Sequence, residues 1–381
     1  MNTFKLLSVF VLITFIVTFV PTLSAQNTLT PMTEKDFLTS GFYGGGLTFI
    51  NGDAYIRIQL QPEIPIGKVG LGFNFVLLYN PYAENAEDQF LAEDGEVWDS
   101  ASTWLRLIRY ISYGDLYDPF YFRLGEFDYL TIGHGSIMSG YSNHDRRGLH
   151  LNLRKTGNKY GVETMVNDLG MPTIFGGRGF YRPFQRLEDN NLLTRMEFGA
   201  TYITDIDPNY PDGDLHSFDA VGVDVGFPIV EQSSFRIDLY NDYAVQTPPV
   251  NPHETMDGDD TSGLPSDIGD TQQEKLTWGN GTGIGLASTK AIFKFEYRIF
   301  SNGYIPSIFD YTYETGIPIF WGYETDNDTR RGFFTQLIIQ PLPELQLLGA
   351  YEQYDNITSK IYLGVNASGL VPQMGFRAFY T

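Results

Sequence analysis

The stretch that decides the fold reads Ala291-Ile-Phe-Lys-Phe-Glu-Tyr-Arg-Ile299. Its alternate positions form two sets, one apolar or aromatic and one largely charged: Phe293, Phe295, Tyr297 and Ile299 against Ile292, Lys294, Glu296 and Arg298. Successive side chains of a β-strand point to opposite faces of its sheet. The alternation therefore predicts a strand with one apolar face and one charged face.

The same two-residue period recurs along the chain. Every odd-numbered position of Val69–Tyr79 is apolar, and Ala54–Gln61 alternates isoleucine or leucine with tyrosine, arginine and glutamine. The pattern favours an all-β protein whose strands separate two environments. We expect strands at about 41–50, 54–61, 68–79, 104–113, 119–126, 148–155, 159–167, 194–204, 219–227, 234–245, 281–287, 290–300, 332–340, 345–354, 359–366 and 372–380, with a weaker one at 172–181.

The first 25 residues predict an export signal. Lys5 precedes an uncharged run from Leu6 to Val20, and small residues end the segment at Ala25. We expect a signal peptide over 1–25, a lead-in over 26–40 and a single β domain over 41–381. A transmembrane anchor is the alternative, but a helix needs about 20 apolar residues to span a bilayer. Any later crossing would use strands, which must form a closed sheet.

The composition excludes some classes of function. The chain has 46 acidic and 25 basic residues, and its formal net charge of −21 argues against a nucleic-acid partner. It has no cysteine, which excludes disulfides and cysteine-ligated metals. Its 25 tyrosines are typical of proteins that meet a membrane interface. A large soluble β-sandwich is the competing class, because its strands also alternate.

Connection lengths carry further information. Some predicted connections are tight and others are long and mostly polar: 156–158, 287–289 and 341–344 against 81–103, 127–147, 205–218, 246–280 and 301–331. If the long ones share one end of a barrel, an even number of strands separates 127–147 from 205–218. That parity supports the weak strand at 172–181. Bacterial barrels have even strand numbers, so we expect about 16 strands (14–18), with 304–314 as a further candidate strand.

The chain resembles a bacterial outer-membrane β-barrel of the porin-like kind. The export signal, the strands of alternating polarity and the loop lengths carry the resemblance. The final segment Met374–Thr381 is similar to the terminal signal of such barrels, although it ends in Tyr380-Thr381 and not in an aromatic residue. The resemblance implies a closed up-and-down antiparallel transmembrane barrel in a Gram-negative outer membrane. It also implies contact with outer-membrane lipid, lipopolysaccharide and the barrel-assembly machinery.

The predicted inward faces define a candidate lumen, because an arginine or lysine facing lipid costs about 2–4 kcal/mol at the bilayer midplane. These charges either brace the wall as pairs or form a mixed-charge permeation path. With the resemblance, they predict a non-enzymatic channel for small polar solutes, without a cofactor. The candidate lumen residues are Arg57, Arg123, His150, Arg154, Glu163, Glu197, Asp224, Arg236, Asp238, Lys294, Glu296, Arg298 and Arg377.

Two other functions stay open at this point. A lipid hydrolase needs a serine within reach of a histidine base. Ser142-Asn143 has Gly140 where such enzymes place the histidine, and His134 precedes Ser136 without a following asparagine, so His134 or His144 would have to fold back. A non-conducting scaffold would be favoured if 127–147 and 169–190 plugged the barrel.

We expect no metal site. Met256–Thr261, with Asp267 and Asp270, superficially resembles a calcium loop. Counted from Asp257, however, the twelfth position is Ile268, where a calcium loop needs a bidentate glutamate. The five histidines are scattered along the chain, which disfavours a histidine site.

Overall fold

The computed structural model is built from β-strands. It describes residues 43–50, 53–83, 89–92, 104, 107–114, 118–127, 129–144, 146–155, 158–185, 192–208, 217–232, 235–247, 276–315, 329–342, 345–355, 359–366 and 377–380. Its helical elements within these ranges include the short 3-10 turns η1 (Leu193–Arg195) and η2 (Tyr313–Thr315). Across the described ranges, no helix is long and apolar enough to cross a membrane.

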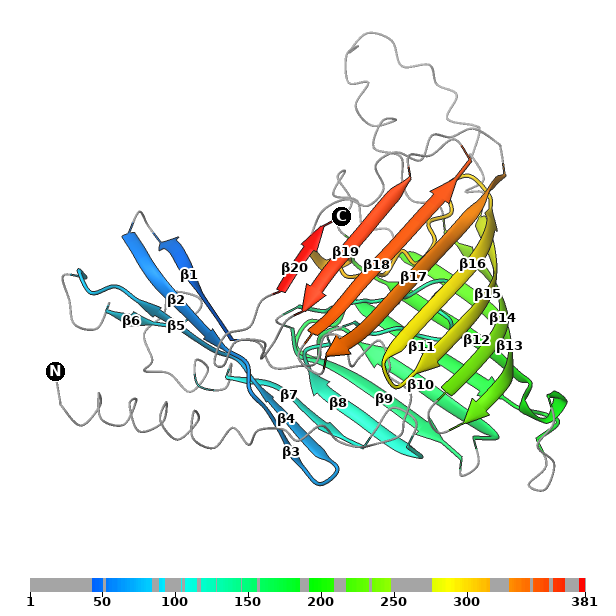
Figure 1. The fold of residues 1–381 in the computed structure, drawn as a ribbon, viewed down its shortest axis with the longest axis horizontal. Coiled ribbons are helices and arrows are strands. Elements are labelled where there is room, and N and C mark those ends of the chain that lie inside the picture. Colours follow the sequence, from blue (N-terminus) through cyan, green and yellow to red (C-terminus); the bar gives the residue numbers. More distant parts are fainter. Residues whose placement is uncertain are drawn as a thin grey trace, which may run out of the picture.

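A curved 16-stranded antiparallel sheet forms the body of the molecule (Figure 1). From β7 to β20 each strand pairs with the next strand in the chain, which is the predicted up-and-down order. The edges are β3 and β20, and no ladder of the described residues joins them. In spatial order the strands are β3 (Glu63–Ile66), β4 (Val69–Phe73), β7 (Ile108–Tyr113), β8 (Phe120–Gly125), β9 (Gly148–Arg154), β10 (Tyr160–Val166), β11 (Ile174–Tyr181), β12 (Glu197–Asp205), β13 (Phe218–Gln232), β14 (Phe235–Gln246), β15 (Thr277–Ser288), β16 (Ala291–Phe300), β17 (Arg330–Leu342), β18 (Leu345–Tyr354), β19 (Lys360–Asn366) and β20 (Arg377–Tyr380).

A second sheet of four strands projects from the β3–β4 edge (Figure 1). It holds β1 (Tyr43–Ile50), β2 (Asp53–Leu60), β5 (Phe75–Tyr79) and β6 (Phe90–Leu91). The prediction of one unbroken strand for 68–79 was wrong, because β4 belongs to the large sheet and β5 to the small one. The preceding strands β2 and β3 are separated at Pro62, which has no N–H to donate to a ladder. The sequence pattern did not predict β3 as a strand.

The large sheet has its polarity reversed relative to a soluble core. Along β16 the charged residues are buried, whereas Phe295 and Tyr297 between them are 40% and 46% exposed. The same holds on β10, where Val162 is exposed and Glu163 is buried. An outer apolar surface around a polar inner face is the arrangement of a wall that meets hydrocarbon, as the alternation predicted.

Connection lengths follow the predicted alternation once β11 is counted. The weakly predicted strand over 172–181 is confirmed as β11. Four tight connections, 155–159, 233–234, 289–290 and 343–344, then fall at one end of the sheet, and 126–147, 206–217, 247–276 and 301–329 fall at the other. Three connections break the rule: 182–196 and 367–376 are long but fall at the tight end, and 355–359 is short but falls at the long end. The extra strand considered at 304–314 was wrong, since this segment forms turns that end in η2.

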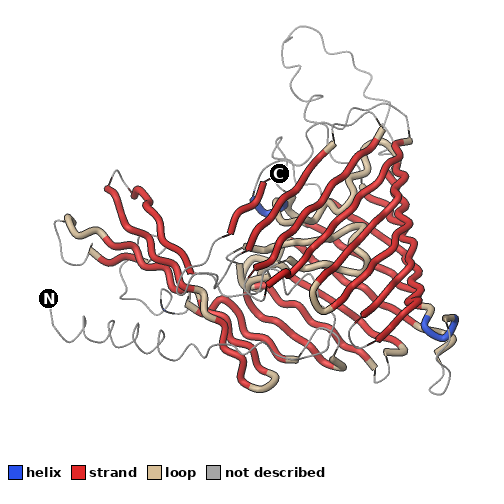
Figure 2. Tube along the Cα trace, viewed as in Figure 1, coloured by secondary structure: helices blue, strands red, loops and turns tan. Residues whose placement is uncertain are grey.

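Two connections turn back over the inner face of the sheet, where Figure 2 shows them as tan tubes within its curve. We call them the first inward segment (126–147, without 128 and 145) and the second inward segment (301–315). They meet in a parallel bridge between Met138 and Phe309. Together with the wall they bury an apolar cluster that contains Phe127, Leu130, Ile132, Ile137, Met138, Tyr141, Met165, Ile174, Ile203, Phe218, Ala220, Ala244, Phe300, Tyr304, Ile305, Ile308, Phe309 and Tyr354.

Candidate functional site

The inner face of the wall carries two clusters of paired charges, the first and the second charge cluster. In the first, Arg178 on β11 bridges two carboxylates, with its Nη2 2.6 Å from Oδ1 of Asp224 and 2.9 Å from Oε1 of Glu197. Arg182 adds a contact of 3.1 Å to the other oxygen of Glu197. A Cβ on Gly199 would lie 2.2 Å from Oδ2 of Asp224, so glycine at this position leaves room for the pair.

The second charge cluster lies on β16. Glu296 is 2% exposed and accepts hydrogen bonds from Arg298, from Tyr240 on β14 at 2.9 Å, and a contact from Lys294 at 2.9 Å. Arg298 also donates to the Tyr354 hydroxyl at 2.9 Å. Each cation of this charge cluster therefore has a partner, which offsets the cost of removing the cation from water.

The first inward segment crosses between the two charge clusters at His134. Lys294 donates to the backbone oxygen of His134 at 2.6 Å, and the imidazole stacks on the Tyr240 ring with centroids 4.3 Å apart. Nε2 of His134 lies 3.7 Å from Oδ1 of Asp224, which is too long for a hydrogen bond. Burial, followed by the charges of Arg178 and Lys294, lowers the pKa of His134 to about 3, so its ring is neutral at physiological pH.

Two small cavities meet at this crossing. The first, of about 10 Å³, is lined by His134, Asp224 and Asp242 among others, and the second, of about 20 Å³, by Glu296 and Arg298. Ser136 and Asp242 line both. Each volume is of the size that holds single water molecules. Asp242 is 2% exposed, and its Oδ1 accepts no hydrogen bond from the described residues.

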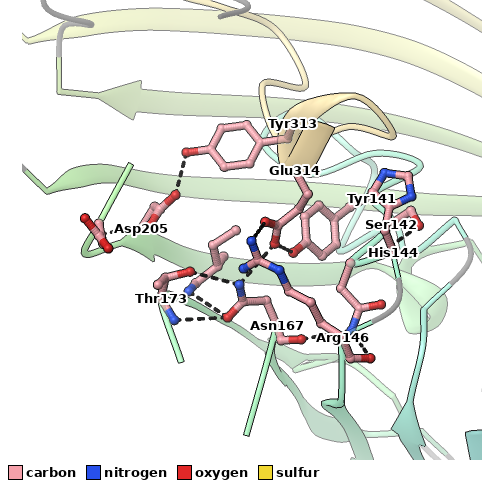
Figure 3. A network of polar contacts seen from close by, with 12 residues as sticks. Tyr141, Ser142, His144, Arg146, Asn167, Thr173, Asp205, Tyr313 and Glu314 are labelled. Atoms are coloured by element: carbon pink, nitrogen blue, oxygen red, sulfur yellow. Dashed lines mark hydrogen bonds and ion pairs between the residues drawn. The ribbon is translucent and has the colours of Figure 1, made fainter. Parts of the chain in front are cut away.

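A polar network joins the two inward segments to the wall (Figure 3). Glu314 of the second segment accepts hydrogen bonds from Tyr141 of the first and, at 3.0 Å, from Asn167 beyond β10. Arg146 contacts the other oxygen of Glu314 at 2.9 Å, and Tyr313 donates to Asp205 on β12 at 2.8 Å. The Glu314 side chain is 7% exposed and that of Arg146 is 40% exposed, so the network is buried at Glu314 and reaches solvent at Arg146.

The remaining predicted lumen residues lie elsewhere on the sheets. His150 contacts Glu163 at 2.8 Å, and both side chains are buried. Arg236 pairs with Asp238 two residues along β14 at 2.6 Å. Three more predicted residues lie on β2, β8 and β9: half-buried Arg57 in the small sheet, buried Arg123 and half-buried Arg154. The Arg377 side chain and the Met256–Thr261 segment with Asp267 and Asp270 lie outside the described residues.

The serines singled out for a hydrolase do not meet a histidine ring. Oγ of Ser142 accepts the backbone N–H of His144 at 3.2 Å, while Nε2 of His144 contacts the backbone oxygen of Tyr311 at 3.0 Å. Ser136 lines the two cavities, but no hydrogen bond joins its hydroxyl to His134. The described geometry therefore contains no activated serine in the first inward segment.

The sequence interpretation missed three important residues of this region: Arg178, Tyr240 and Asp242. Tyr240 and Asp242 share the two-residue phase of Arg236 and Asp238, so the alternation along β14 contained the signal. Arg178 follows Gly176 and Gly177 in a strand without apolar alternation, and its facing was therefore not assigned.

No family model and no curated protein matches this chain. Among solved structures, the chain is similar to OpdK of Pseudomonas aeruginosa, a structure with vanillate, at 12% identity and a TM-score of 0.37 over 89% of this chain and 90% of that one. It is also similar to an anion-selective porin from Comamonas acidovorans, at 9% identity and a TM-score of 0.34 over 89% and 92%. A third is OccAB1 of Acinetobacter baumannii, at 11% identity and a TM-score of 0.36 over 88% and 86%.

Proposed function

We propose that this protein is an outer-membrane channel that passes small polar solutes through a narrowed, charge-lined lumen. The observation that carries the proposal is the reversed polarity of the wall, with Lys294, Glu296 and Arg298 buried inside and Phe295 and Tyr297 exposed outside. A wall with this polarity has lipid as its outer solvent and a polar interior. The export signal predicted over 1–25 supports the same location.

The inner charges fit a path for polar solutes of either sign. Both charge clusters contain cations and carboxylates side by side. A passing solute therefore meets hydrogen-bond donors and acceptors without a strong electrostatic field of one sign. Rings of charged side chains and local constrictions set selectivity in pores. In this protein the two inward segments form the constriction, because they cross the interior, and the gaps at Ser136 and Asp242 are about the size of a water molecule. At these gaps a larger solute passes only if the segments shift.

Solute flux into proteoliposomes tests this proposal. Folded protein should let liposomes swell in small uncharged polar solutes, with a rate that falls steeply as solute size increases. Liposomes prepared with heat-denatured protein are the control. The proposal fails if folded protein gives no more swelling than the control at any solute size.

A non-conducting scaffold is the second candidate, and the apolar cluster around Met138 and Phe309 favours it. A dry cluster inside the barrel resists water and therefore permeation. The plug considered for 169–190 was wrong, however, because 174–181 is wall strand β11 and the second inward segment takes that place. Absence of flux from correctly folded protein, together with a stable inner cluster, would select the scaffold.

Fractionation tests the proposed location. The protein should separate with outer membranes and should migrate faster on a gel when unboiled than when boiled, because a folded barrel stays compact in detergent. Recovery in the soluble periplasmic fraction would contradict both the location and the channel.

A further inference from the structure

Two acidic residues face each other directly on the inner side of the wall. Asp224 on β13 is the register partner of Asp242 on β14. Like charges at directly opposed positions of a ladder are destabilising. Arg178 neutralises Asp224, with contacts to both carboxylate oxygens at 2.6 and 3.0 Å. Asp242 has no ion pair of this kind within the described part of the chain, so the arrangement leaves one buried carboxylate without a counterion in contact.

Two polar atoms at this place lack partners. Oδ1 of Asp242 and Nε2 of His134 are both buried and make no hydrogen bond with the described residues. Asp242 is 2% exposed and lines both cavities at the crossing. A buried carboxylate without a partner is costly, and most such groups in proteins are paired or coordinate a metal. These two atoms therefore point to a ligand.

The geometry fits a metal ion. His134, Asp224 and Asp242 each offer one ligand atom, and these atoms all lie within 4.8 Å of one another. The 3.7 Å between Nε2 of His134 and Oδ1 of Asp224 is close to the edge of a tetrahedral site. With metal–ligand bonds of about 2.1 Å, such an edge is about 3.4 Å long. A small inward adjustment of the side chains would bring all three atoms into coordination.

The donor set favours a transition metal over calcium. One imidazole nitrogen and two carboxylates suit Zn²⁺, which takes three protein ligands and a water at open sites. Ca²⁺ takes six to eight oxygen ligands, more than this place offers. The cavity of about 10 Å³ is lined by all three ligands and has room for the ion. The second cavity, of about 20 Å³, is also lined by Asp242 and has room for the fourth, water ligand. Arg178 pairs with the ligand Asp224 and also contacts Glu197, and Lys294 contacts Glu296. Carboxylates outside the site therefore share the charge of both cations, which reduces their repulsion of an ion.

We infer that His134, Asp224 and Asp242 bind a divalent transition-metal ion of the zinc type at the contact between the first inward segment and the wall. The ion would join β13 and β14 to the segment that narrows the lumen. This site deepens the proposed function, because a bound cation at the constriction would regulate passage, and that consequence alone rests on the channel proposal.

Zinc binding to the purified, folded protein in detergent tests the site. The protein is stripped with a chelator, and Zn²⁺ affinity is then measured by competition with a chromophoric chelator and by calorimetry. Wild type should bind one equivalent. Asp242→Asn and His134→Phe should each weaken binding about tenfold or more, because each removes one ligand. The phenylalanine keeps a ring to stack on Tyr240.

Asp238→Asn is the matched control. Asp238 lies on the same strand and the same face as Asp242, but it pairs with Arg236, and its loss should leave zinc affinity unchanged. Folding of each variant is checked by its faster migration when unboiled, and two independent ligand variants keep the test decisive if one fails to fold. The inference is overturned if wild type binds no zinc, if both ligand variants keep full affinity, or if Ca²⁺ binds as tightly as Zn²⁺.

A conductance arm separates this inference from the proposed function. Zinc should reduce ion flow through wild type in a planar bilayer and should leave Asp242→Asn unaffected. Zinc binding that depends on His134 and Asp242 in a protein that never conducts supports the metal site and contradicts the channel. Conduction in a protein that binds no zinc supports the channel and contradicts the site.

Discussion

Lys294 and Phe295 are neighbours on β16, yet the lysine is 9% exposed and the phenylalanine 40%. In a water-soluble protein the expected order is the reverse, because apolar side chains leave water and charged ones stay in it. Lys294 contacts Glu296 at 2.9 Å, while the Phe295 ring stacks with Phe333 of β17 on the outer face at 6.1 Å. The two side chains thus mark the polar and apolar sides of one wall.

Replacing Phe295 with arginine should impair insertion of the folded barrel. A charge on the lipid face costs about 2–4 kcal/mol near the bilayer midplane. The measurement is the free energy of folding into lipid vesicles, followed by the shift in gel migration of unboiled protein. Phe295→Leu, which keeps the face apolar, should change this free energy far less. Equal losses for both variants would indicate that the outer face packs against protein and not lipid.

Glu314→Gln should loosen the two inward segments. Glu314 receives Tyr141, Asn167 and Arg146, and hydrogen bonds to a charged group contribute about 1.5–3 kcal/mol. We expect faster amide hydrogen exchange at Leu130 and Tyr141, whose backbone groups pair across the first inward segment at 2.7 and 2.9 Å.

The partner variant Tyr141→Phe provides the control for this prediction. Glu314→Gln removes the charge of the acceptor and Tyr141→Phe removes the donor of the same hydrogen bond. The effects of the two changes on exchange should therefore combine to less than their sum. Strictly additive effects would show that Glu314 and Tyr141 act independently, and unchanged exchange in Glu314→Gln would contradict the role of the network.

Gly199→Ala should disturb the first charge cluster. The added Cβ would lie 2.2 Å from Oδ2 of Asp224 and 2.5 Å from Nη2 of Arg178, so the ion pair must move. Overpacking of this kind costs about 1–3 kcal/mol. Gly179→Ala on the neighbouring strand is the control, since nothing lies within 4 Å of its Cβ position. Chemical denaturation from lipid vesicles measures both, and equal stability of the two variants would refute the close packing at Gly199.

Single cysteines should report the two ends of the sheet. The chain has no native cysteine, so each introduced thiol is unique. Met171 precedes β11 at the end of the long connections, and Thr289 lies in the tight β15–β16 turn. If long loops face outward, Met171→Cys should react with an impermeant maleimide on intact cells and Thr289→Cys only after the outer membrane is opened. The reverse pattern would invert the orientation, and labelling of both on intact cells would contradict a spanning sheet.

Strand positions and facing followed from the sequence because one physical rule governs both. Alternation along Ala291–Ile299 is visible in the chain, and the loop parity required β11 although Gly176 and Gly177 hide its pattern. Neither β3, which follows Pro62, nor the division of 68–79 between β4 and β5 was predicted, because the apolar period runs through both places. Whether a strand continues in the same sheet depends on its neighbours, and local sequence does not contain them.

The inner site was only partly predictable. Asp224, Lys294 and Glu296 were assigned to the inner face by their phase along a strand. The placement of His134 beside Asp224 depends on how the first inward segment folds. The contacts of that segment with Phe309 and Lys294 join residues more than 150 positions apart. Scattered histidines argued against a metal cluster in the sequence, but the fold brings one of them next to two wall carboxylates.

Single-channel conductance of the purified protein in a planar bilayer tests the central claim most directly. A polar lumen narrowed by two inward segments predicts small, discrete conductance steps for wild type and larger steps for Glu314→Gln, in which the constriction is loosened. Folded protein that inserts into the bilayer and gives no steps, in wild type and in Glu314→Gln alike, would contradict the channel.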